Sequence, residues 1–291
     1  MSERSDDERD FDAREAFALL GQEIRLDILF ALLEHWRAAH TEPQSYSSLM
    51  RAVDMQDSGK FNYHLKRLRG VYVRKVEDGY VPTASATALY RAILATRPTE
   101  DAERSTIAVE DACPDCGGSL SGTYEGSFLT VHCEDCGTTP GGFTYPFPKN
   151  GLAGRDDAAV LEAVSRRASQ HIELARSGQC PFCAGRTAVA LDCDADLPVE
   201  IECDTCSFVV AVTFLQALKT VPRVTAALVA LGIERDGAWD LPESTATVRT
   251  DDPLEIEVTI ESDGRTAEVV VDQRLDVLSV TVDGERVGPE R

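Results

Sequence analysis

Lysine is scarce in this sequence of 291 residues: five lysines, at positions 60, 66, 75, 149 and 219, stand against 50 acidic residues, and the formal net charge is −21. The acidic surplus is spread along most of the chain, which resembles halophilic proteins, whose dispersed carboxylates keep the surface hydrated in concentrated salt. Salt of about 1 M also shortens the Debye length to about 3 Å and screens long-range repulsion from DNA. The net charge therefore excludes no nucleic-acid partner, because the local charge at a contact surface decides binding.

Long apolar runs and a secretion signal are missing as well. No stretch of about 18 apolar residues exists, so we expect no transmembrane helix and no membrane partner. The segment 1–12 is charged and mostly acidic, without the basic-then-apolar order of a signal peptide. We therefore expect a cytoplasmic protein. Hydrophobic residues make up 43% of the chain, enough for packed cores, and its length suits two or three domains.

Sequence signatures of enzymes are also absent. The chain holds no glycine-rich phosphate loop, no HExxH and no GxSxG motif, and its five histidines form no spaced cluster. Carboxylates are so numerous that no single pair is informative. We therefore expect no enzymatic activity. An enzyme built on a zinc module stays an alternative, which would require a zinc ion with an open coordination position.

Cysteine carries the most specific pattern, since eight of nine cysteines fall in four CxxC pairs. Within two groups of four, 16 and 19 residues separate the pairs, which matches the spacing of zinc sites with four cysteine ligands. Four thiolates complete a tetrahedron and leave no open position, so we expect two structural Zn²⁺ sites. The predicted ligands are Cys113, Cys116, Cys133 and Cys136 in the first site, and Cys180, Cys183, Cys203 and Cys206 in the second.

Two alternatives for these sites remain open. The modules could sense redox state, or they could grip nucleic acid or a protein partner. Only one basic residue, Arg186, lies between the outer cysteines of either group, which speaks against direct DNA contact. The ninth cysteine, Cys193, is expected to be a partly buried free thiol, with redox exchange as its alternative.

The spacing of apolar residues and the positions of turn residues predict an α+β, multidomain fold. Alternating apolar residues over 246–283, with turn signals at Asp263-Gly264 and Asp283-Gly284, predict a small C-terminal antiparallel β-sheet. The two cysteine modules, with their helices, suggest a duplicated unit of about 65 residues. The expected segments are an acidic tail (1–12), a winged helix-turn-helix domain (13–97), a linker (98–112), a first zinc ribbon closed by a third strand within 143–148 (113–153), a connecting helix (154–179), a second zinc ribbon with a helix over 214–232 (180–240), and a C-terminal β region (241–291).

The order of elements over residues 13–97 is that of a winged helix-turn-helix. Apolar residues at helical spacing, broken by Gly21, predict helices over about 12–20 and 22–38. A third helix opens near Ser47 as N-cap, a turn covers 54–57, and a fourth helix starts at Ser58-Gly59 and ends at Gly70. A hairpin over 71–83 follows where the wing would lie.

The fourth helix has one apolar and one polar face. Phe61, Leu65 and Leu68 share the apolar face, and His64 lies at its boundary, where packing is the expected role. Between residues 58 and 76 there are six basic residues and no acidic one. The predicted DNA contacts are Lys60, Asn62, Tyr63, Lys66, Arg67, Arg69, Arg74 and Lys75.

Three motifs resemble the ArsR-type winged helix domains of halophilic archaea: LLGQEIRLDIL (19–29), SGKFNYHLKRL (58–68) and GYVPTASATALYRAI (79–93). The resemblance implies that helix 58–69 enters the major groove and that hairpin 71–82 contacts the backbone or minor groove. It also implies a homodimer built from the helices at 12–20 and 84–97, with Leu89, Tyr90 and Ile93 as packing residues. No cysteine precedes Cys113, so the metalloid sensing of some family members is not expected here.

The leading hypothesis is a dimeric, sequence-specific regulator of transcription that binds double-stranded DNA, with a C-terminal part that senses a signal or stabilises the dimer. The alternative is an interaction protein, because a winged helix combined with zinc ribbons also resembles initiation factors that bridge RNA polymerase and promoter.

Overall fold

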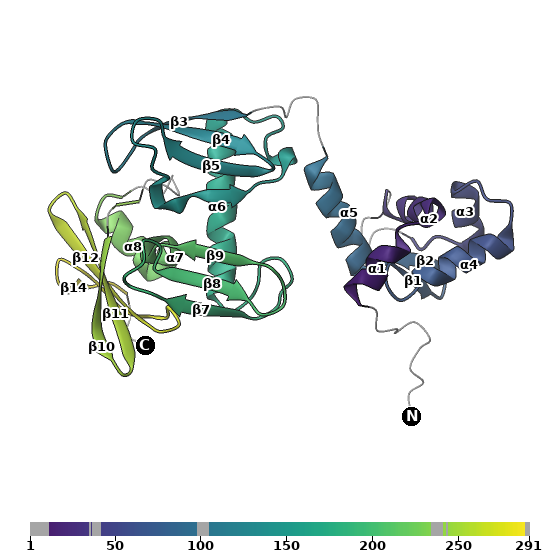
Figure 1. Ribbon diagram of the computed structural model, residues 1–291. Helices are drawn as coiled ribbons and strands as arrows, with labels where there is room; N and C mark the ends of the chain where they lie inside the picture. Colours follow the sequence, from purple (N-terminus) through teal and green to yellow (C-terminus); the bar gives the residue numbers. More distant parts are fainter. Residues whose placement is uncertain are drawn as a thin grey trace. The chain divides into compact units, whose positions relative to one another are not determined.

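The computed structural model describes residues 12–34, 36, 42–97, 105–233, 241–242 and 244–288. The chain divides into two compact units, residues 1–97 and 98–291 (Figure 1). Over the described residues the fold is α+β, with eight α-helices and four sheets whose strand pairs are all antiparallel. None of the described helices is long and apolar enough to span a membrane. Almost all of the predicted acidic tail, residues 1–11, lies outside the described residues.

The first unit packs five helices against a two-stranded hairpin. Its elements are α1 (Ala13–Leu19), α2 (Glu23–Leu33), α3 (Tyr46–Ala52), α4 (Ser58–Leu68), β1 (Val73–Val76), β2 (Gly79–Pro82) and α5 (Ala84–Thr96). The predicted apolar face of α4 is confirmed, since Phe61, Leu65 and Leu68 are all buried in the core of this unit. Their burial fixes which side of α4 stays in solvent.

Three predicted helix ends are corrected. Ser45, rather than Ser47, caps α3 and accepts a hydrogen bond from the Ser48 amide (3.1 Å). Asp57 caps α4 through the amides of Gly59 and Lys60 (2.9 and 3.0 Å), because its carboxylate reaches two unpaired amides at once. The second helix ends at Leu33, earlier than predicted, and residues 37–41 lie outside the described part of the chain.

The segment just before α3 pairs with the β1–β2 hairpin. Gln44 and Tyr80 exchange two backbone hydrogen bonds, of 3.0 and 2.9 Å. This close approach requires glycine at position 79, where φ is +152° and an added Cβ would lie 2.4 Å from the Gln44 carbonyl oxygen. The position of the hairpin is therefore coupled to that of α3.

The second unit begins with a four-stranded sheet. It contains β3 (Thr106–Ala112), β4 (Ser119–Glu125), β5 (Phe128–Cys133) and β6 (Thr144–Pro146), with the short turns η2 (Pro140–Gly142) and η3 (Lys149–Gly151). The predicted third strand within 143–148 is confirmed as β6, which pairs with β5. The predicted linker 98–112 is wrong in its second half, because residues 106–112 form β3 on β4; residues 98–104 lie outside the described residues.

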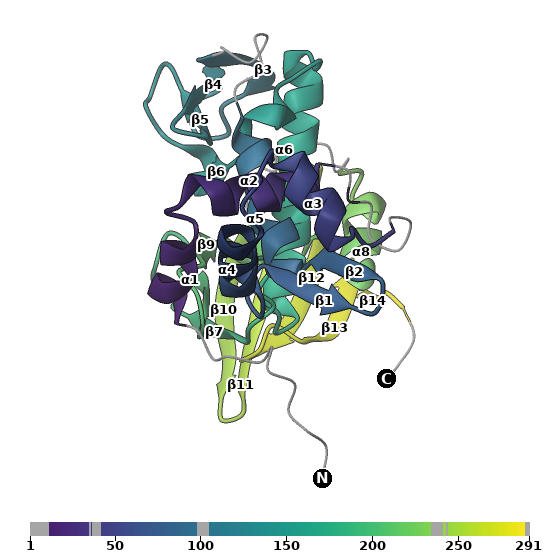
Figure 2. The same ribbon diagram turned by 90° about the vertical axis from the view of Figure 1, so that its right-hand side faces the viewer.

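A 20-residue helix joins this sheet to the next one. The first twelve residues of α6 (Asp157–Arg176) include Val160, Val164 and Ala168, which pack into the core formed with β3–β6. Its last turn places Ala175 in the second core. In both views α6 runs past β3–β6 and reaches the sheet of β7 (Thr187–Leu191), β8 (Val199–Cys203) and β9 (Val209–Val212) (Figures 1 and 2).

The single helix predicted over 214–232 is in fact two. α7 (Phe214–Leu218) ends before Val221, and α8 (Pro222–Ala230) starts with proline at its first position. Val221 is extended (φ −67°, ψ 124°) because the ring of the following proline disfavours the helical conformation there. The break turns α8 onto the C-terminal sheet.

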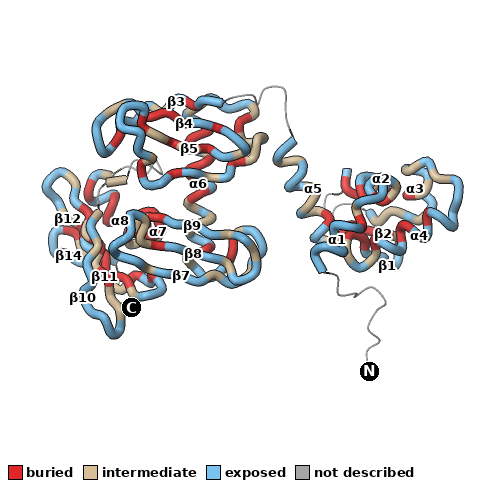
Figure 3. The backbone as a smooth tube through the Cα atoms, in the orientation of Figure 1, coloured by how far each residue is buried: buried red, intermediate tan, exposed pale blue. Residues whose placement is uncertain are grey.

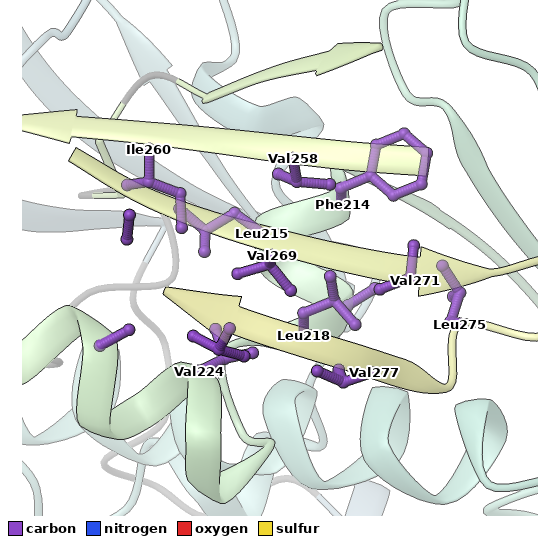
Figure 4. Packing of buried hydrophobic residues seen from close by; sticks show 14 of the residues in the cluster. Phe214, Leu215, Leu218, Val224, Val258, Ile260, Val269, Val271, Leu275 and Val277 are labelled. Atoms are coloured by element: carbon purple, nitrogen blue, oxygen red, sulfur yellow. The ribbon is translucent and has the colours of Figure 1, made fainter. Parts of the chain in front are cut away.

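The predicted C-terminal antiparallel sheet is confirmed as a five-stranded meander. Its strands are β10 (Ser244–Asp251), β11 (Leu254–Ser262), β12 (Arg265–Asp272), β13 (Val277–Val282) and β14 (Glu285–Arg286). Both predicted Asp-Gly turns have positive φ at the two residues, as a tight hairpin turn requires. Buried and less buried residues alternate along β8 and β11 (Figure 3), and the buried side chains of β11–β13 face Leu215, Leu218 and Val224 of α7 and α8 (Figure 4).

Candidate functional site

The first predicted cysteine quartet comes together at one end of β4 and β5. All four sulfur atoms lie within 4.8 Å of one another. The Sγ–Sγ distance is 3.8 Å between Cys113 and Cys136, and 3.5 Å between Cys116 and Cys133. A tetrahedron of sulfurs at about 2.3 Å from a metal ion has edges of about 3.8 Å, while a disulfide bond measures about 2.05 Å. The arrangement therefore fits a bound metal ion and excludes disulfides.

The second quartet repeats this geometry on β7 and β8. Its sulfurs also lie within 4.8 Å of one another, with Sγ–Sγ distances of 3.6 Å between Cys180 and Cys206 and 3.5 Å between Cys183 and Cys203. In each group, one cysteine of the first pair is buried and its partner is exposed. Four thiol donors without a carboxylate or histidine suit a soft or borderline ion.

Tight turns set the direction of the thiols. Cys113 accepts at its carbonyl from the Gly117 amide (2.8 Å) and donates its own amide to Gly118 O (2.8 Å). Gly117 and Gly137, which follow the second cysteine of each pair in the first group, have φ of +70° and +76°. Ala184 occupies the corresponding position in the second group with φ +59°, a conformation that is costly for a residue with a Cβ.

Backbone amides donate hydrogen bonds to several of the cysteine sulfurs. In the second group, Gly185 and Thr205 donate to the Sγ atoms of Cys183 and Cys203, both at 3.3 Å. In the first group, hydrogen bonds from the Thr138 hydroxyl and amide lower the pKa of the Cys136 thiol to about 6. Such donors stabilise negative charge on a metal-bound sulfur.

The ninth cysteine was predicted wrongly in one respect. Cys193 is exposed rather than partly buried, because it lies in the loop between β7 and β8. Desolvation, with the carboxylates of Asp194 and Asp192, raises the pKa of its thiol. It therefore stands apart from the second quartet.

The predicted DNA-contacting residues lie on one side of α4 and on β1, a surface that we call the α4–β1 basic surface. Arg69, directly after α4, is half-buried, and the other seven residues are exposed: Lys60, Asn62, Tyr63, Lys66, Arg67, Arg74 and Lys75. Residues 1–97 hold 14 basic and 15 acidic side chains, while residues 98–291 hold 15 basic and 35 acidic side chains. The excess of acid thus belongs to the second unit.

A buried arginine that the sequence did not reveal forms a hydrogen bond with a histidine of α4. Arg25 on α2 is 8% exposed and donates from Nη1 to Leu19 O (3.0 Å) and from Nε to His64 Nδ1 (3.4 Å). Burial, together with the positive charges of Arg25 and Lys60, lowers the pKa of His64. The expected packing role of His64 is confirmed, because its ring is buried and accepts a hydrogen bond inside the unit.

Apolar side chains remain exposed on the outer helices of the first unit. Phe17 on α1 is 65% exposed, Phe30 on α2 is 41% and Ile93 on α5 is 53%. Two of the predicted packing residues, Leu89 and Tyr90, already contact the core of their own unit, and Tyr90 meets the edge of the Phe30 ring. Of the three predicted packing residues, Ile93 is the one whose side chain is exposed.

The two cysteine modules are joined by an aromatic contact chain. The Tyr145 hydroxyl on β6 lies 2.8 Å from His171 Nδ1 on α6, and the His171 ring meets Phe182 between two ligands of the second group. Burial, with the nearby charge of Arg167, lowers the pKa of His171 to about 4, so the ring is neutral and forms a hydrogen bond with the tyrosine hydroxyl. The two modules therefore pack as parts of one unit.

Two family models match the chain. One, described as a domain of unknown function (DUF7351), matches residues 110–277 and includes all eight predicted ligands. The other, also described as a domain of unknown function (DUF7347), matches residues 13–93 within the first unit. No curated protein and no solved structure matches the chain.

Proposed function

This chain belongs to the DUF7351 family, and we propose that it is a sequence-specific transcription regulator that binds double-stranded DNA through its first unit. The observation that carries the proposal is the α4–β1 basic surface. The apolar side of α4 is buried, which leaves five exposed basic residues and the half-buried Arg69, with no acidic residue between positions 58 and 76, in a protein of net charge −21. Such a surface neutralises phosphates.

In this proposal α3, the turn at 53–57, α4 and the β1–β2 hairpin form a winged helix-turn-helix of ArsR type. α4 enters the major groove, where Asn62, Lys66 and Arg67 meet base edges and phosphates. Arg74 and Lys75 on β1 contact the DNA backbone. The Gln44–Tyr80 backbone bonds support this function because they hold the hairpin at a fixed angle to the helices.

A homodimer completes the proposed regulator. The exposed Phe17 and Ile93, on α1 and α5, supply apolar area that a single copy leaves in solvent. A two-fold dimer through these helices would present two copies of α4 to successive turns of the major groove. The operator would then be palindromic, with half-sites about one helical turn apart.

Zn²⁺ is the ion that we propose for both cysteine groups. Four thiolates at tetrahedral spacing suit Zn²⁺ and leave it no open position, which supports a structural role in two zinc ribbons. When bound, the ion cross-links two turns in each module. Thiols that hold zinc must stay reduced, which favours a cytoplasmic location.

The test is selection of binding sites from random duplex DNA with zinc-loaded protein in molar KCl. The Lys66→Ala/Arg67→Ala variant removes two residues of the α4–β1 basic surface, and Arg166→Ala/Arg186→Ala removes two exposed arginines of the second unit as a matched control. We expect a palindromic motif from the wild type and the control, and none from the first variant. Equal enrichment by all three proteins would refute the assignment of the surface.

A bridging factor between RNA polymerase and promoter is the second candidate. It is favoured by Phe182 and Val209, which flank the second cysteine group with 57% and 58% of their surface exposed, as a protein-binding module would have. This candidate predicts co-purification with RNA polymerase and no enriched DNA motif from a folded protein.

A further inference from the structure

One edge of the second cysteine module is an unprotected strand. β7 pairs with β8 on one side, and no described strand pairs with its other side. Its five residues, Thr187–Leu191, include no charge and no proline. Proteins usually protect such edges with charged residues, bulges or covering segments, because an open edge pairs with other chains.

The remaining longer sheet edges of this unit are protected. β3 carries Glu110 and Asp111, and β10 carries Arg249 and Asp251 with a bulge after Val248. β9 has no charge, but it lies beside the segment 142–145, with which it lines a cavity of about 60 Å³. Beyond Thr187, whose amide bonds to Gly178 O, β7 is therefore an uncharged edge with which no described strand pairs.

The register of β7 shows which backbone groups are available. The Asp204 amide donates to Arg186 O (3.1 Å) and the Asp192 amide to Pro198 O (2.9 Å), so even-numbered residues point their backbone groups toward β8. The odd-numbered Thr187 donates its amide the other way, to Gly178 O (3.3 Å). By the two-residue period, the amide and carbonyl groups of Val189 and Leu191 face outward.

A groove runs along this outward side. A cavity of about 840 Å³ is lined by Thr187, Val189 and Leu191 on one wall, and by Leu254 and the β12–β13 turn on the other. This volume is large enough for several residues of an extended peptide. The strand edge and the groove together offer main-chain hydrogen bonds and a side wall.

Two arginines give the groove its charge preference. Arg176, at the end of α6, donates from Nη1 to Leu275 O (3.3 Å), which fixes its guanidinium at the groove wall. Arg274 is exposed on the opposite turn, whose shape is set by hydrogen bonds from its own amide and the Asp276 amide to Asp272 Oδ1 (2.8 and 2.9 Å). Asp276 is the single carboxylate among the described residues that line the groove, so this lining has a net positive charge in a unit of 15 basic and 35 acidic residues.

We propose that this groove binds an extended acidic peptide of a partner protein, which adds to β7 as a further strand and places carboxylates against Arg176 and Arg274. The main chain of the peptide pairs with the outward groups of Val189 and Leu191. The arginines select acidic side chains through charge-assisted hydrogen bonds. The second unit thereby recruits a protein, a function separate from DNA binding by the first unit.

The probe is a fluorescein-labelled seven-residue peptide that alternates valine and glutamate, titrated against the full zinc-loaded protein by fluorescence anisotropy. One control peptide replaces glutamate with lysine, and another carries N-methyl groups on alternate amides and cannot pair as a strand. We expect the acidic peptide to bind with a Kd below about 1 mM, and both controls to bind at least about tenfold more weakly.

Variants separate the two parts of the groove. Val189→Pro removes an outward amide but spares the β7–β8 ladder, and Arg274→Glu reverses one charge; each should weaken the acidic peptide by about tenfold or more. Arg166→Glu, on the outer face of α6, makes the same charge change away from the groove and should leave binding unaltered. Equal binding of the N-methylated peptide, or unchanged binding to both groove variants, would overturn the proposal.

Discussion

Replacing Gly79 by alanine should uncouple the hairpin from the rest of the first unit. In the Gly79→Ala variant the added Cβ would lie 2.4 Å from Gln44 O and 2.8 Å from Gln44 C, both backbone atoms that no side-chain rotation can move. A non-glycine residue at φ +152° costs about 1–3 kcal/mol by itself. Loss of the two Gln44–Tyr80 backbone bonds adds about 1 kcal/mol each. We expect the first unit to lose about 3–5 kcal/mol of stability.

Hydrogen exchange followed by mass spectrometry measures this loss locally in the full chain. Amides of Tyr80 and its neighbours in β1 and β2 should exchange about a hundredfold faster or more, while amides of β11 and β12 in the second unit serve as an internal reference. Gly21→Ala is the matched control, since its added Cβ meets only Ala18 O at an ordinary 3.5 Å. If both variants open within about 1 kcal/mol of each other, the close approach at Gly79 is not a constraint and this reasoning fails.

Four further changes test other parts of the molecule. Lys66→Ala/Arg67→Ala should reduce the slope of log Kd against log KCl concentration for duplex DNA by about 2, because each lost phosphate contact lowers the slope by about 0.9. An unaltered slope would show that these two residues do not contact phosphates. Because the pKa of His64 is lowered in the folded state, the unfolded state binds its proton more readily, so the contribution of His64 to stability should be complete above the unfolded pKa of about 6.5 and be lost as the pH falls below it. The His64→Asn variant should therefore show a flatter dependence of unfolding free energy on pH in that range. An unchanged dependence would mean that another group causes it. Cys133→Ser should reduce bound zinc, counted by native mass spectrometry, from two ions to one, and a variant that still holds two would contradict the first site. Ala184→Gly should stabilise the second module by about 1 kcal/mol in denaturant unfolding, because glycine adopts positive φ without strain; a destabilised variant would argue against the turn at that residue.

The eight predicted ligands could be found from the sequence because the CxxC spacing is local. Two thiols three residues apart converge on one point in almost any tight turn, and Gly117 and Gly137 mark such turns in the first group. The two-faced character of α4 was also readable, since helical geometry alone puts Phe61 opposite Lys66. The identity of the partner on each surface stays a prediction.

Misassigned elements were those that depend on a neighbour. Residues 106–112 look like an acidic linker, and they become β3 because β4 offers a free edge. Arg25 was not singled out from the sequence, and it is buried because Leu19 O and His64 accept its hydrogen bonds. Pro222 is a sequence signal for the break between α7 and α8, but the prediction of one helix over 214–232 followed the apolar pattern, which continues through this proline.

The sequence by itself determined the local features of this protein: the cysteine pairs, the basic stretch over residues 58–76, the turn residues and the alternation of the C-terminal strands. Each of these depends on spacings of a few residues, which backbone geometry converts directly into structure. Tertiary structure alone decided the burial of Arg25, the closeness of Gln44 to Gly79, and the groove where the edge of β7 faces Arg274, more than 80 residues away. Such features arise when elements distant in the sequence pack together, and a local sequence pattern does not predict which elements will contact each other.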